Sequence, residues 1–376
     1  MHRARLVLVS LAIIALVVAA CDAAPPAASP TGQPTAGNGT PSNGSPTGEA
    51  SPTPAAPAGA RLAAVQSRGT LICGVNGSLA GFSVLDPTSN EMTGFDADYC
   101  RALAAAVLGD PTAVEFRQLS AAERGPALQA GAVDVLIRNT TWTVSRDTTW
   151  GLFAPTTFFD GQGMMVNTTR TDATDLAGLA GATICVQSGT TTELNLTDQM
   201  RAQNISFTPQ VFAEIDPTYQ AYEEGRCDAV TSDRGQLVAR RTGFANPSEH
   251  VLLDVVMSKE PLGPVAPLGD DQWFNVVKWM VFATFEAEEQ GITAANVQEM
   301  TGSNNPVIRR LLGVEQPELG QGLGLSPDWV VTMIGAVGNY AEIYDRNLGP
   351  DTAFDLDRGP NRLWTEGGLL YAMPYR

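Results

Sequence analysis

Histidine is scarce in this sequence. Only His2 and His250 occur among the 376 residues, and His250 lies far from the polar segments described below. The chain also has no C-x-x-C pair with companion histidines and no nucleophile-elbow motif. These absences argue against a zinc site and against histidine-dependent catalysis. We therefore expect no metal, no cofactor and no enzymatic activity.

Basic residues are also few. The chain has 23 Lys and Arg residues against 40 Asp and Glu residues, which gives a formal net charge of −17. A protein that binds nucleic acid normally carries a basic surface, so we expect no nucleic-acid partner. The acidic surface says little about a small ligand, because solvated charge mainly affects solubility and self-repulsion.

Long apolar runs are missing except at the N-terminus. Arg3 and Arg5 precede an apolar run over residues 6–20, which is short for a membrane span and ends in small residues. These features predict a lipoprotein signal peptide over residues 1–20 that is cleaved before Cys21, whose sulfur would then carry lipid. The alternative is an ordinary cleaved signal followed by a chance cysteine.

Large apolar side chains are almost absent from residues 21–60, which consist mainly of Pro, Ala, Ser, Thr and Gly. Such a segment cannot bury enough surface to offset the entropy of ordering, so it is expected to be a disordered tether. No later segment has the length and apolarity of a membrane span. We expect a monomer outside the cytoplasm, held at the outer face of the cell membrane or in the periplasm by lipid on Cys21.

The rest of the chain has an α/β pattern and is long enough for two lobes. Apolar segments that are typical of strands alternate with amphipathic segments that are typical of helices, which predicts open, largely parallel sheets flanked by helices. Gly125-Pro126 should kink or shorten one helix. The expected strands are 71–75, 113–119, 133–137, 183–186, 208–212 and 228–231, and the expected helices are 96–109, 120–131, from Thr191, 217–224, 270–288, 305–312 and 328–346.

The chain is expected to cross between the lobes twice, near Val166-Asn167 and again near Val256-Met257-Ser258. The first lobe would comprise residues 61–166 and 257–376, and the second lobe residues 167–256. Two crossing strands form a hinge.

Four cysteines remain once Cys21 is assigned to lipid, and they can pair in an oxidising compartment. Four cysteines allow three connectivities. We favour Cys73 with Cys100, since one lies in a strand and the other in the helix expected to pack on it. Cys185 and Cys227 occupy corresponding places in the second strand and helix set.

The most informative polar segment is 138–147, Arg-Asn-Thr-Thr-Trp-Thr-Val-Ser-Arg-Asp, which follows a buried strand. Open α/β sheets bind ligands at the carboxyl ends of their strands. Arg146 can offer a bidentate guanidinium to a carboxylate, and Thr141 and Thr143 can add hydroxyl donors. A solvated loop is the alternative interpretation of this segment.

Two further polar segments follow strands of the second lobe. In 187–193, Thr190 and Thr191 begin a helix whose free N–H groups suit an anion, although Thr190 can equally be a plain helix cap. In 232–234, Asp233 can pair with an ammonium group or cap the next helix. Together the three segments supply partners for both charges of an α-amino acid, which can be desolvated only when both are paired.

Several segments of the chain after Arg61 resemble the general L-amino-acid periplasmic binding proteins of polar amino-acid ABC transporters, solute-binding protein family 3. These segments are 73–76, 94–100, 138–147, 158–163 and 258–264. The resemblance implies the type II two-lobe fold, with open mixed sheets, a two-strand hinge and ABC transporter permease subunits as partners. It also implies that Arg146 clamps the α-carboxylate with help from Thr141 and Thr190, and that Asp233 holds the α-ammonium group.

The side-chain end of the ligand is less defined. The resemblance places Asn76 and Leu79 among the ligand-binding residues. Related binders of basic amino acids carry an acidic reader and an aromatic lid near these two positions, so a preference for lysine or arginine is not expected. Arg138 and Asn139 suit an acidic or amide side chain, although Arg138 can instead be a salt-bridged surface residue.

Two alternatives use the same scaffold. One is an enzyme such as a dehydratase, because dehydratases that resemble these binders exist and carboxylates can serve as general acids. A sensor module that reports ligand to a membrane receptor would use the same pocket.

Overall fold

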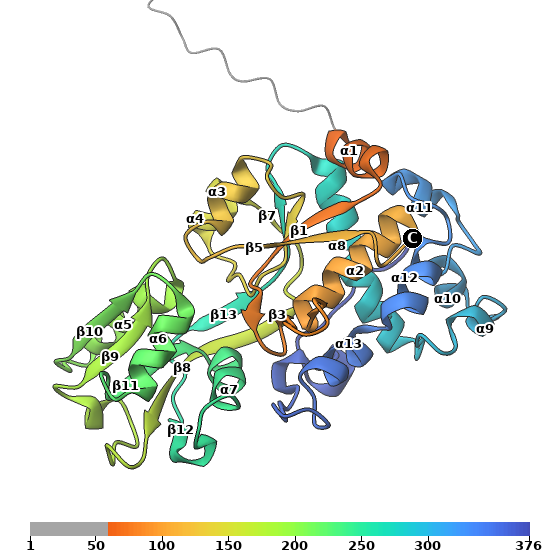
Figure 1. Ribbon diagram of the computed structural model, residues 1–376. Helices are drawn as coiled ribbons and strands as arrows, with labels where there is room; N and C mark the ends of the chain where they lie inside the picture. The colour runs from red at the N-terminus through yellow and green to blue at the C-terminus, as the bar shows by residue number, and fades with distance from the viewer. Residues whose placement is uncertain (1–58) are drawn as a thin grey trace, which may run out of the picture. The chain divides into compact units, whose positions relative to one another are not determined.

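The computed structural model describes residues 59–376, so the predicted signal peptide, Cys21 and most of the predicted tether lie outside the described residues. Within this part of the chain, two separate mixed sheets each form the centre of a lobe (Figure 1). None of its helices combines the length and the apolarity that a membrane crossing needs.

The first sheet has five strands in the order β5-β1-β6-β14-β7. Strands β5, β1 and β6 are parallel, whereas β14 runs antiparallel to β6 and β7. Helices α2 and α8 pack against this sheet, and a small three-stranded sheet of β2, β3 and β4 lies beside it. The elements of this region are α1 (Ala60–Arg68), β1 (Leu71–Val75), β2 (Ser78–Leu79), β3 (Ser83–Leu85), β4 (Met92–Thr93), α2 (Phe95–Leu108), β5 (Val114–Gln118), α3 (Arg124–Gln129), β6 (Val135–Leu136), α4 (Val144–Thr149), β7 (Gly151–Phe153) and β14 (Val265–Pro267).

The second sheet has the order β10-β9-β11-β8-β12 and is parallel from β10 to β11. Because successive residues of a strand face opposite sides, Ile184 and Val186 pack with Leu196 of α5, while Cys185 packs with Tyr222 of α6 on the other face. The elements are β8 (Phe158–Asn167), η1 (Ala177–Leu179), β9 (Thr183–Gln187), α5 (Thr191–Ala202), β10 (Thr208–Phe212), α6 (Ile215–Glu223), β11 (Ala229–Asp233), α7 (Arg234–Arg241), η2 (Pro247–Glu249) and β12 (His250–Leu252).

Two antiparallel strands connect the lobes, β8 and β13 (Lys259–Leu262). The first part of β8, 158–161, pairs with β13, and the following part, 162–166, pairs with β11 of the second sheet. The first crossing therefore lies before Gln162, earlier than the expected position at Val166-Asn167. Gln162 is hydrogen-bonded to both Met257 and Ser258, close to the expected second crossing.

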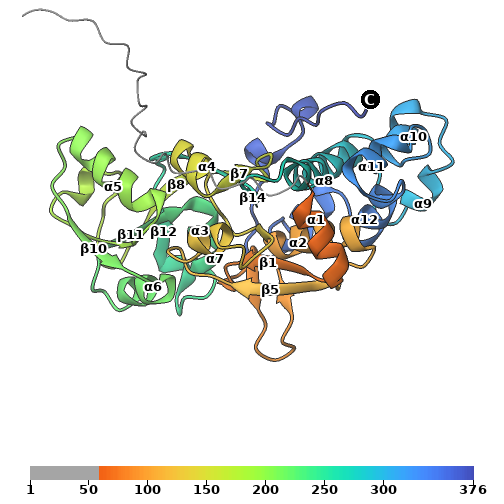
Figure 2. The ribbon, with the colours of Figure 1, turned by 90° about the horizontal axis from the view of Figure 1, so that it is seen from above.

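Helices after residue 270 belong to the first lobe. The apolar face of α8 is buried in the first core together with residues of α2 and α12. Figure 2 shows these three helices together in the first lobe. The predicted helix over 328–346 is two helices, because Gly338 ends α12 and Asn339 with Glu342 forms a capping box for α13. The elements are α8 (Asp271–Glu289), α9 (Val297–Met300), α10 (Pro306–Leu311), α11 (Glu318–Leu323), α12 (Trp329–Val337), α13 (Tyr340–Asn347), η3 (Gly359–Asn361) and η4 (Trp364–Glu366).

The C-terminal segment returns to the connecting strand β8. Asn361 is buried, accepts a 2.6 Å hydrogen bond from the backbone N–H of Phe159 and donates one of 3.1 Å to the carbonyl of the same residue. This pair of bonds fixes the first-lobe end of β8.

Each lobe contains one disulfide bond. Cys73 of β1 is bonded to Cys100 of α2, and Cys185 of β9 is bonded to Cys227, which lies two residues before the start of β11. These are the two pairs that the sequence predicts. Each bond ties a central strand to a neighbouring part of its own lobe, and neither joins the two lobes.

Candidate functional site

Polar residues follow the carboxyl ends of parallel strands in both sheets and surround one pocket. The first sheet contributes residues after β1 and β6, and the second contributes residues after β9 and at the end of β11. The pocket and the solvent at its mouth together contain about 350 Å³ of space free of protein atoms. Its lining residues are Asn76, Ala121, Arg124, Arg138, Asn139, Thr141, Gln187, Thr190, Thr191, Thr192, Ser232, Asp233 and Gln236.

Asp96 fixes the turn that carries Arg138 and Asn139. Gly94 occupies the N-cap of α2, and the Asp96 carboxylate accepts a 2.9 Å hydrogen bond from the backbone N–H of Asn139. Burial raises the pKa of Asp96 to about 6, although this bond and the nearby Arg138 guanidinium oppose the shift. Asn139 adopts φ of 29°, a left-handed conformation that asparagine tolerates better than most residues.

Arg138 is buried at 4% exposure, so the alternative of a salt-bridged surface residue is wrong. Its Nε donates a 2.7 Å hydrogen bond to the carbonyl of Leu119. Burial lowers the pKa of Arg138 to about 10, while Asp96 opposes the shift. Its guanidinium contributes positive charge to the pocket wall.

Arg146 lies next to the pocket wall rather than among its lining residues. Its Nη1 donates a 3.0 Å hydrogen bond to the carbonyl of Thr141, and its guanidinium lies 4.9 Å from the ring centre of Trp150. Thr143 caps α4 by accepting a hydrogen bond from the N–H of Arg146. Burial lowers the pKa of Arg146, and Glu260 and Asp233 oppose this shift.

Arg124 is a lining residue that the sequence interpretation missed. It is 4% exposed, and its Nη1 lies 3.3 Å from Thr140 Oγ1 and 3.4 Å from the carbonyl of Asn139. Its Nε is buried without a hydrogen-bond acceptor among the described residues. Burial and the positive charges of Arg138 and Arg146 lower its pKa. Three guanidinium groups therefore lie at or beside the pocket.

The second-lobe wall begins at α5. Thr190 caps this helix by accepting a 3.1 Å hydrogen bond from the N–H of Glu193. Thr191 donates a 2.8 Å hydrogen bond to Glu260 of β13, and Asn195 donates one of 3.0 Å to the other oxygen of the same carboxylate. The predicted cap at Thr190 is thus present, and its helix end faces the pocket.

Asp233 supplies the buried carboxylate of the second-lobe wall. It is 7% exposed, and within residues 59–376 its side chain accepts no hydrogen bond and does not cap α7. Burial raises the pKa of Asp233 well above its usual range, and the carboxylates of Asp160 and Glu260 raise it further. A cationic ligand group placed here would relieve this destabilisation of the ionised form.

The two walls are in contact. Thr141 and Thr191 have hydroxyl oxygens 3.4 Å apart, and the side-chain amide of Asn139 donates a 3.2 Å hydrogen bond to Gln236 of α7. Gln236 was not predicted, because its position within a helix gives no sign of what it faces. A ligand in the pocket would therefore meet both lobes at once.

The remaining predicted residues have different outcomes. Asn76 lines the pocket, and its amide donates a 3.3 Å hydrogen bond to Asn139. Leu79 does not line it, because the β2–β3 hairpin buries this side chain in the apolar core of the first lobe at 1% exposure. His250 is also remote from the pocket and contacts Tyr222 and Phe244 in the second-lobe core.

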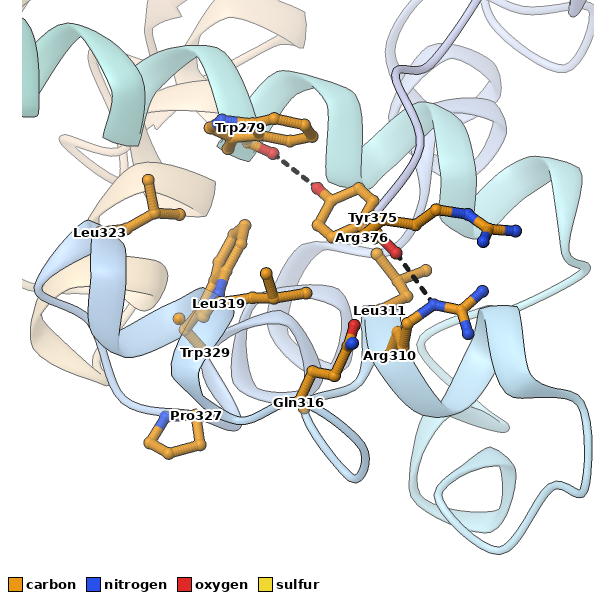
Figure 3. A pocket seen from close by; sticks show the side chains of 12 residues that line it. Trp279, Arg310, Leu311, Gln316, Leu319, Leu323, Pro327, Trp329, Tyr375 and Arg376 are labelled. Atoms are coloured by element: carbon orange, nitrogen blue, oxygen red, sulfur yellow. Dashed lines mark hydrogen bonds between the residues drawn. The ribbon is translucent and has the colours of Figure 1, made fainter.

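A second pocket lies between C-terminal helices of the first lobe (Figure 3). Arg310 donates a hydrogen bond to the carbonyl of Tyr375, and the Tyr375 hydroxyl donates one to the carbonyl of Trp279. It shares no lining residue with the pocket between the lobes. Across residues 59–376, no cluster of three or more His, Cys, Asp or Glu side chains is arranged to hold a metal ion.

Comparison with known proteins identifies relatives of the whole two-lobe region. Residues 71–260 match the model of the bacterial extracellular solute-binding proteins, family 3. The general L-amino acid-binding periplasmic protein AapJ of Rhizobium johnstonii is 49% identical over 84% of this chain and 92% of its own length. The glutamate/glutamine/aspartate/asparagine-binding protein BztA of Rhodobacter capsulatus is 46% identical over 83% of this chain and 92% of its own length.

A solved structure extends the likeness to three dimensions. The ABC transporter periplasmic binding protein of Brucella ovis with glutathione bound has a TM-score of 0.82 and 50% sequence identity, over 84% of this chain and 99% of that one. The two-lobe fold is that of the type II periplasmic binding proteins. From its sequence and its fold together, this chain belongs to the bacterial extracellular solute-binding proteins of family 3.

Proposed function

We propose that this chain is an extracytoplasmic solute-binding lipoprotein that captures a polar L-amino acid and delivers it to the permease subunits of an ABC transporter. Arg146, Thr141 and Thr190 hold the α-carboxylate, with the helix start at Thr191 alongside. Asp233 holds the α-ammonium group. The likeness to periplasmic amino-acid-binding proteins over nearly their full length supports this class of function.

The observation that carries the proposal is the Asp233 carboxylate. It is buried in a pocket with guanidinium groups on the opposite wall, and no group in residues 59–376 donates a hydrogen bond to it. An isolated buried carboxylate is costly, and pairing with a ligand ammonium group offsets that cost. Partners for both ends of a zwitterion thus come from different lobes.

The pocket favours an acidic or amide side chain. Arg138 and Arg124 add positive charge beyond the single guanidinium that an α-carboxylate needs, and Asn139 and Gln187 offer amide groups. Charge-assisted bonds from arginine suit a second carboxylate, and the amides suit glutamine or asparagine. The ligands named for BztA are of these four kinds, and the glutathione named for the Brucella relative carries a glutamate head with free α-groups.

The lipid anchor rests on the sequence alone. Cys21 follows a small-residue cleavage motif, so the mature chain would begin at a lipid-carrying cysteine and be held at a membrane surface. We propose that the anchored protein acts as a monomer and a carrier, without catalysing a reaction on its ligand.

Isothermal titration calorimetry of ligand-stripped protein against the twenty amino acids tests the specificity. We expect glutamate, glutamine, aspartate and asparagine to bind more tightly than lysine and arginine by at least tenfold, which corresponds to about 1.4 kcal/mol. Mass spectrometry of the recovered ligand should show it unchanged. Tightest binding of lysine, or chemical conversion of the ligand, would contradict the proposal.

A further inference from the structure

A large cavity lies on the other side of the hinge from the amino-acid pocket. Glu260 of β13 contacts Thr141 and Thr191 of the pocket walls, whereas its neighbours Lys259 and Pro261 line the cavity. Successive residues of a strand face opposite sides, so this connecting strand separates the two spaces, which share no lining residue. We call the second space the rear cavity. With the solvent at its mouth it contains about 1660 Å³ free of protein atoms.

The rear cavity has walls from both lobes, and both walls are largely apolar. Leu252 and Val256 line it from the second lobe, and Leu356 and Leu369 line it from the C-terminal segment of the first lobe. Val256 and Leu369, one on each wall, are 68% and 57% exposed to solvent. Removing such surface from water is favourable, so an apolar molecule between these walls would be stabilised by contacts with both lobes at once.

The acidic groups of the rear cavity already have partners. Asp160 accepts hydrogen bonds of 2.7 and 2.9 Å, one at each carboxylate oxygen, from two backbone N–H groups. Asp357 is paired with Arg362. Arg358, which also lines the cavity, is paired with Glu288. The charge that a ligand meets is therefore set mainly by the other ionised groups of the lining.

Two cations of the lining have no acidic partner. Within residues 59–376, neither Lys259 nor Arg234 forms a salt bridge, and the hydrogen bonds that Arg234 donates go to the backbone carbonyls of Leu253 and Val255. The two positive charges outnumber the single negative charge of the nearby Asp160, so the lining favours an anion. An apolar molecule with one carboxylate matches both the apolar walls and this excess of positive charge.

We propose that the rear cavity is a regulatory site for an aliphatic carboxylate, such as a medium-chain fatty acid, and that its occupation strengthens binding of the amino acid. The carboxylate pairs with Lys259, and the aliphatic chain lies between the two apolar walls. The pocket walls are in contact on the pocket side of the hinge, and a rotation that separates them brings the rear walls together. A molecule in the rear cavity therefore opposes opening. This coupling, unlike the site itself, rests on the proposed function.

Calorimetry with decanoate, 1-decanol and decyltrimethylammonium, each below its micelle concentration, tests the site. We expect decanoate to bind about two- to fivefold more tightly than decanol, and the cation to bind most weakly. Octanoate should bind about three- to tenfold more weakly than decanoate, because two fewer methylene groups are buried. Saturating decanoate should lower the Kd for glutamate by about fivefold or more, and saturating glutamate should lower the Kd for decanoate by the same factor.

Two variants locate the effect. Lys259→Gln should weaken decanoate binding by about two- to fivefold and leave decanol binding unchanged. Leu369→Glu, which adds a negative charge to an exposed position of the apolar wall, should weaken decanoate binding by about fivefold or more. Lys278→Gln, at the other lysine of the chain, changes a residue of α8 outside the rear cavity and is the matched control. Glutamate binding without decanoate should be unchanged in all three variants.

The outcomes separate the site, the coupling and the proposed function. Equal affinities for decanoate and the cation, or unchanged decanoate binding in both cavity variants, would overturn the site. Decanoate binding that leaves the affinity for glutamate unchanged, or lowers it, would overturn the coupling. A dimer in sedimentation velocity that decanoate dissociates would show that a second copy of this chain covers these walls, which also overturns the proposal. Failure of glutamate to bind would contradict the proposed function, which decanoate binding does not require.

Discussion

The carboxylate of Glu260 accepts a 2.6 Å hydrogen bond from the hydroxyl of Thr141, and the same oxygen accepts one of 2.8 Å from Thr191. Thr141 belongs to the first-lobe wall and Thr191 to the second. Glu260 lies on the connecting strand β13 and is fully buried. One carboxylate therefore joins both walls beside the hinge.

Replacing Glu260 with Gln should destabilise the protein. A glutamine side chain has only one acceptor oxygen, so at least one of the buried donors that now face the carboxylate loses its acceptor, at a cost of about 1–3 kcal/mol. We expect a lower Tm in thermal denaturation followed by circular dichroism. The exposed change Glu299→Gln serves as the control, and an equal Tm for both variants would show that this network contributes little to stability.

Arg146→Ala should abolish tight binding of the amino acid while the fold survives. The ligand carboxylate would lose its charge-assisted bonds and remain buried without a partner, which predicts a loss of about 2–5 kcal/mol, more than tenfold in affinity. Calorimetry measures the loss, and far-ultraviolet circular dichroism checks the fold. Arg362→Ala, which removes a partly exposed arginine paired with Asp357, is the matched control. Unchanged affinity in Arg146→Ala would refute the assigned role.

Binding should release protons from Asp233. Burial with the charges of Asp160 and Glu260 raises the pKa of this carboxyl well above its usual range. The empty pocket therefore retains a proton that a free aspartate would lose, and a ligand ammonium group would expel it. Affinity should decrease as the pH falls through the pKa of Asp233.

Calorimetry at pH 6 in buffers of different ionisation enthalpy measures the number of protons released. Asp233→Asn should bind weakly and release fewer protons per ligand bound. For the stability of the ligand-free protein the sign is opposite. Burial raises the folded-state pKa of Asp160 to about 6. The stabilisation from this group is fully present below its pKa in the unfolded chain, and the free energy of unfolding decreases as the pH rises through about 6. No buffer dependence of the binding enthalpy would contradict the ammonium site at Asp233.

Ligand should favour closure of the two lobes. Arg146 belongs to the first lobe and Asp233 to the second, so neither lobe alone pairs both charges of a zwitterion. Small-angle X-ray scattering of stripped and saturated protein should show a smaller radius of gyration with ligand, and Asp233→Asn should reduce binding and compaction together. Identical profiles at confirmed saturation would rule out closure as the signal to the transporter.

Cys21→Ser should release the protein from membranes. A thioether-linked lipid on this cysteine would be the stable anchor, and serine cannot form the thioether. Fractionation of cells that express the variant measures the change, with Ser29→Ala as the control in the same segment. A variant that still sediments with membranes must be held by another anchor.

The sequence was informative where periodicity or strand order decides the structure. β10 was predicted with its observed bounds, and both disulfide pairs followed from matching strand and helix positions. Residues that follow the carboxyl ends of parallel strands, such as Thr190 and Asp233, were placed at one pocket for the same reason. Arg146, predicted by the same rule, lies just outside the lining.

The misses have local physical causes. Arg124 begins the short helix α3, which contains Gly125-Pro126. The position of Arg124 in the sequence does not show that its long side chain reaches Thr140. Leu79 was assigned to the ligand from its place in the resemblance, but hairpin pairing turns it into the core. Glu260 and Gln236 face the pocket region only because a second segment packs against them, which no local pattern encodes.

The two hydrogen bonds between Asn361 and the backbone of Phe159 have a practical use. They clamp β8 at its first-lobe end, so bending of this strand should concentrate around Gly161 and Gln162, where its pairing changes from β13 to β11. Because one end of β8 is fixed, the strand should bend in the same way each time ligand binds, and the lobes should move by one reproducible displacement. A fluorophore on α5 and an acceptor dye on α3 would then form an optical sensor whose signal has two levels, empty and loaded.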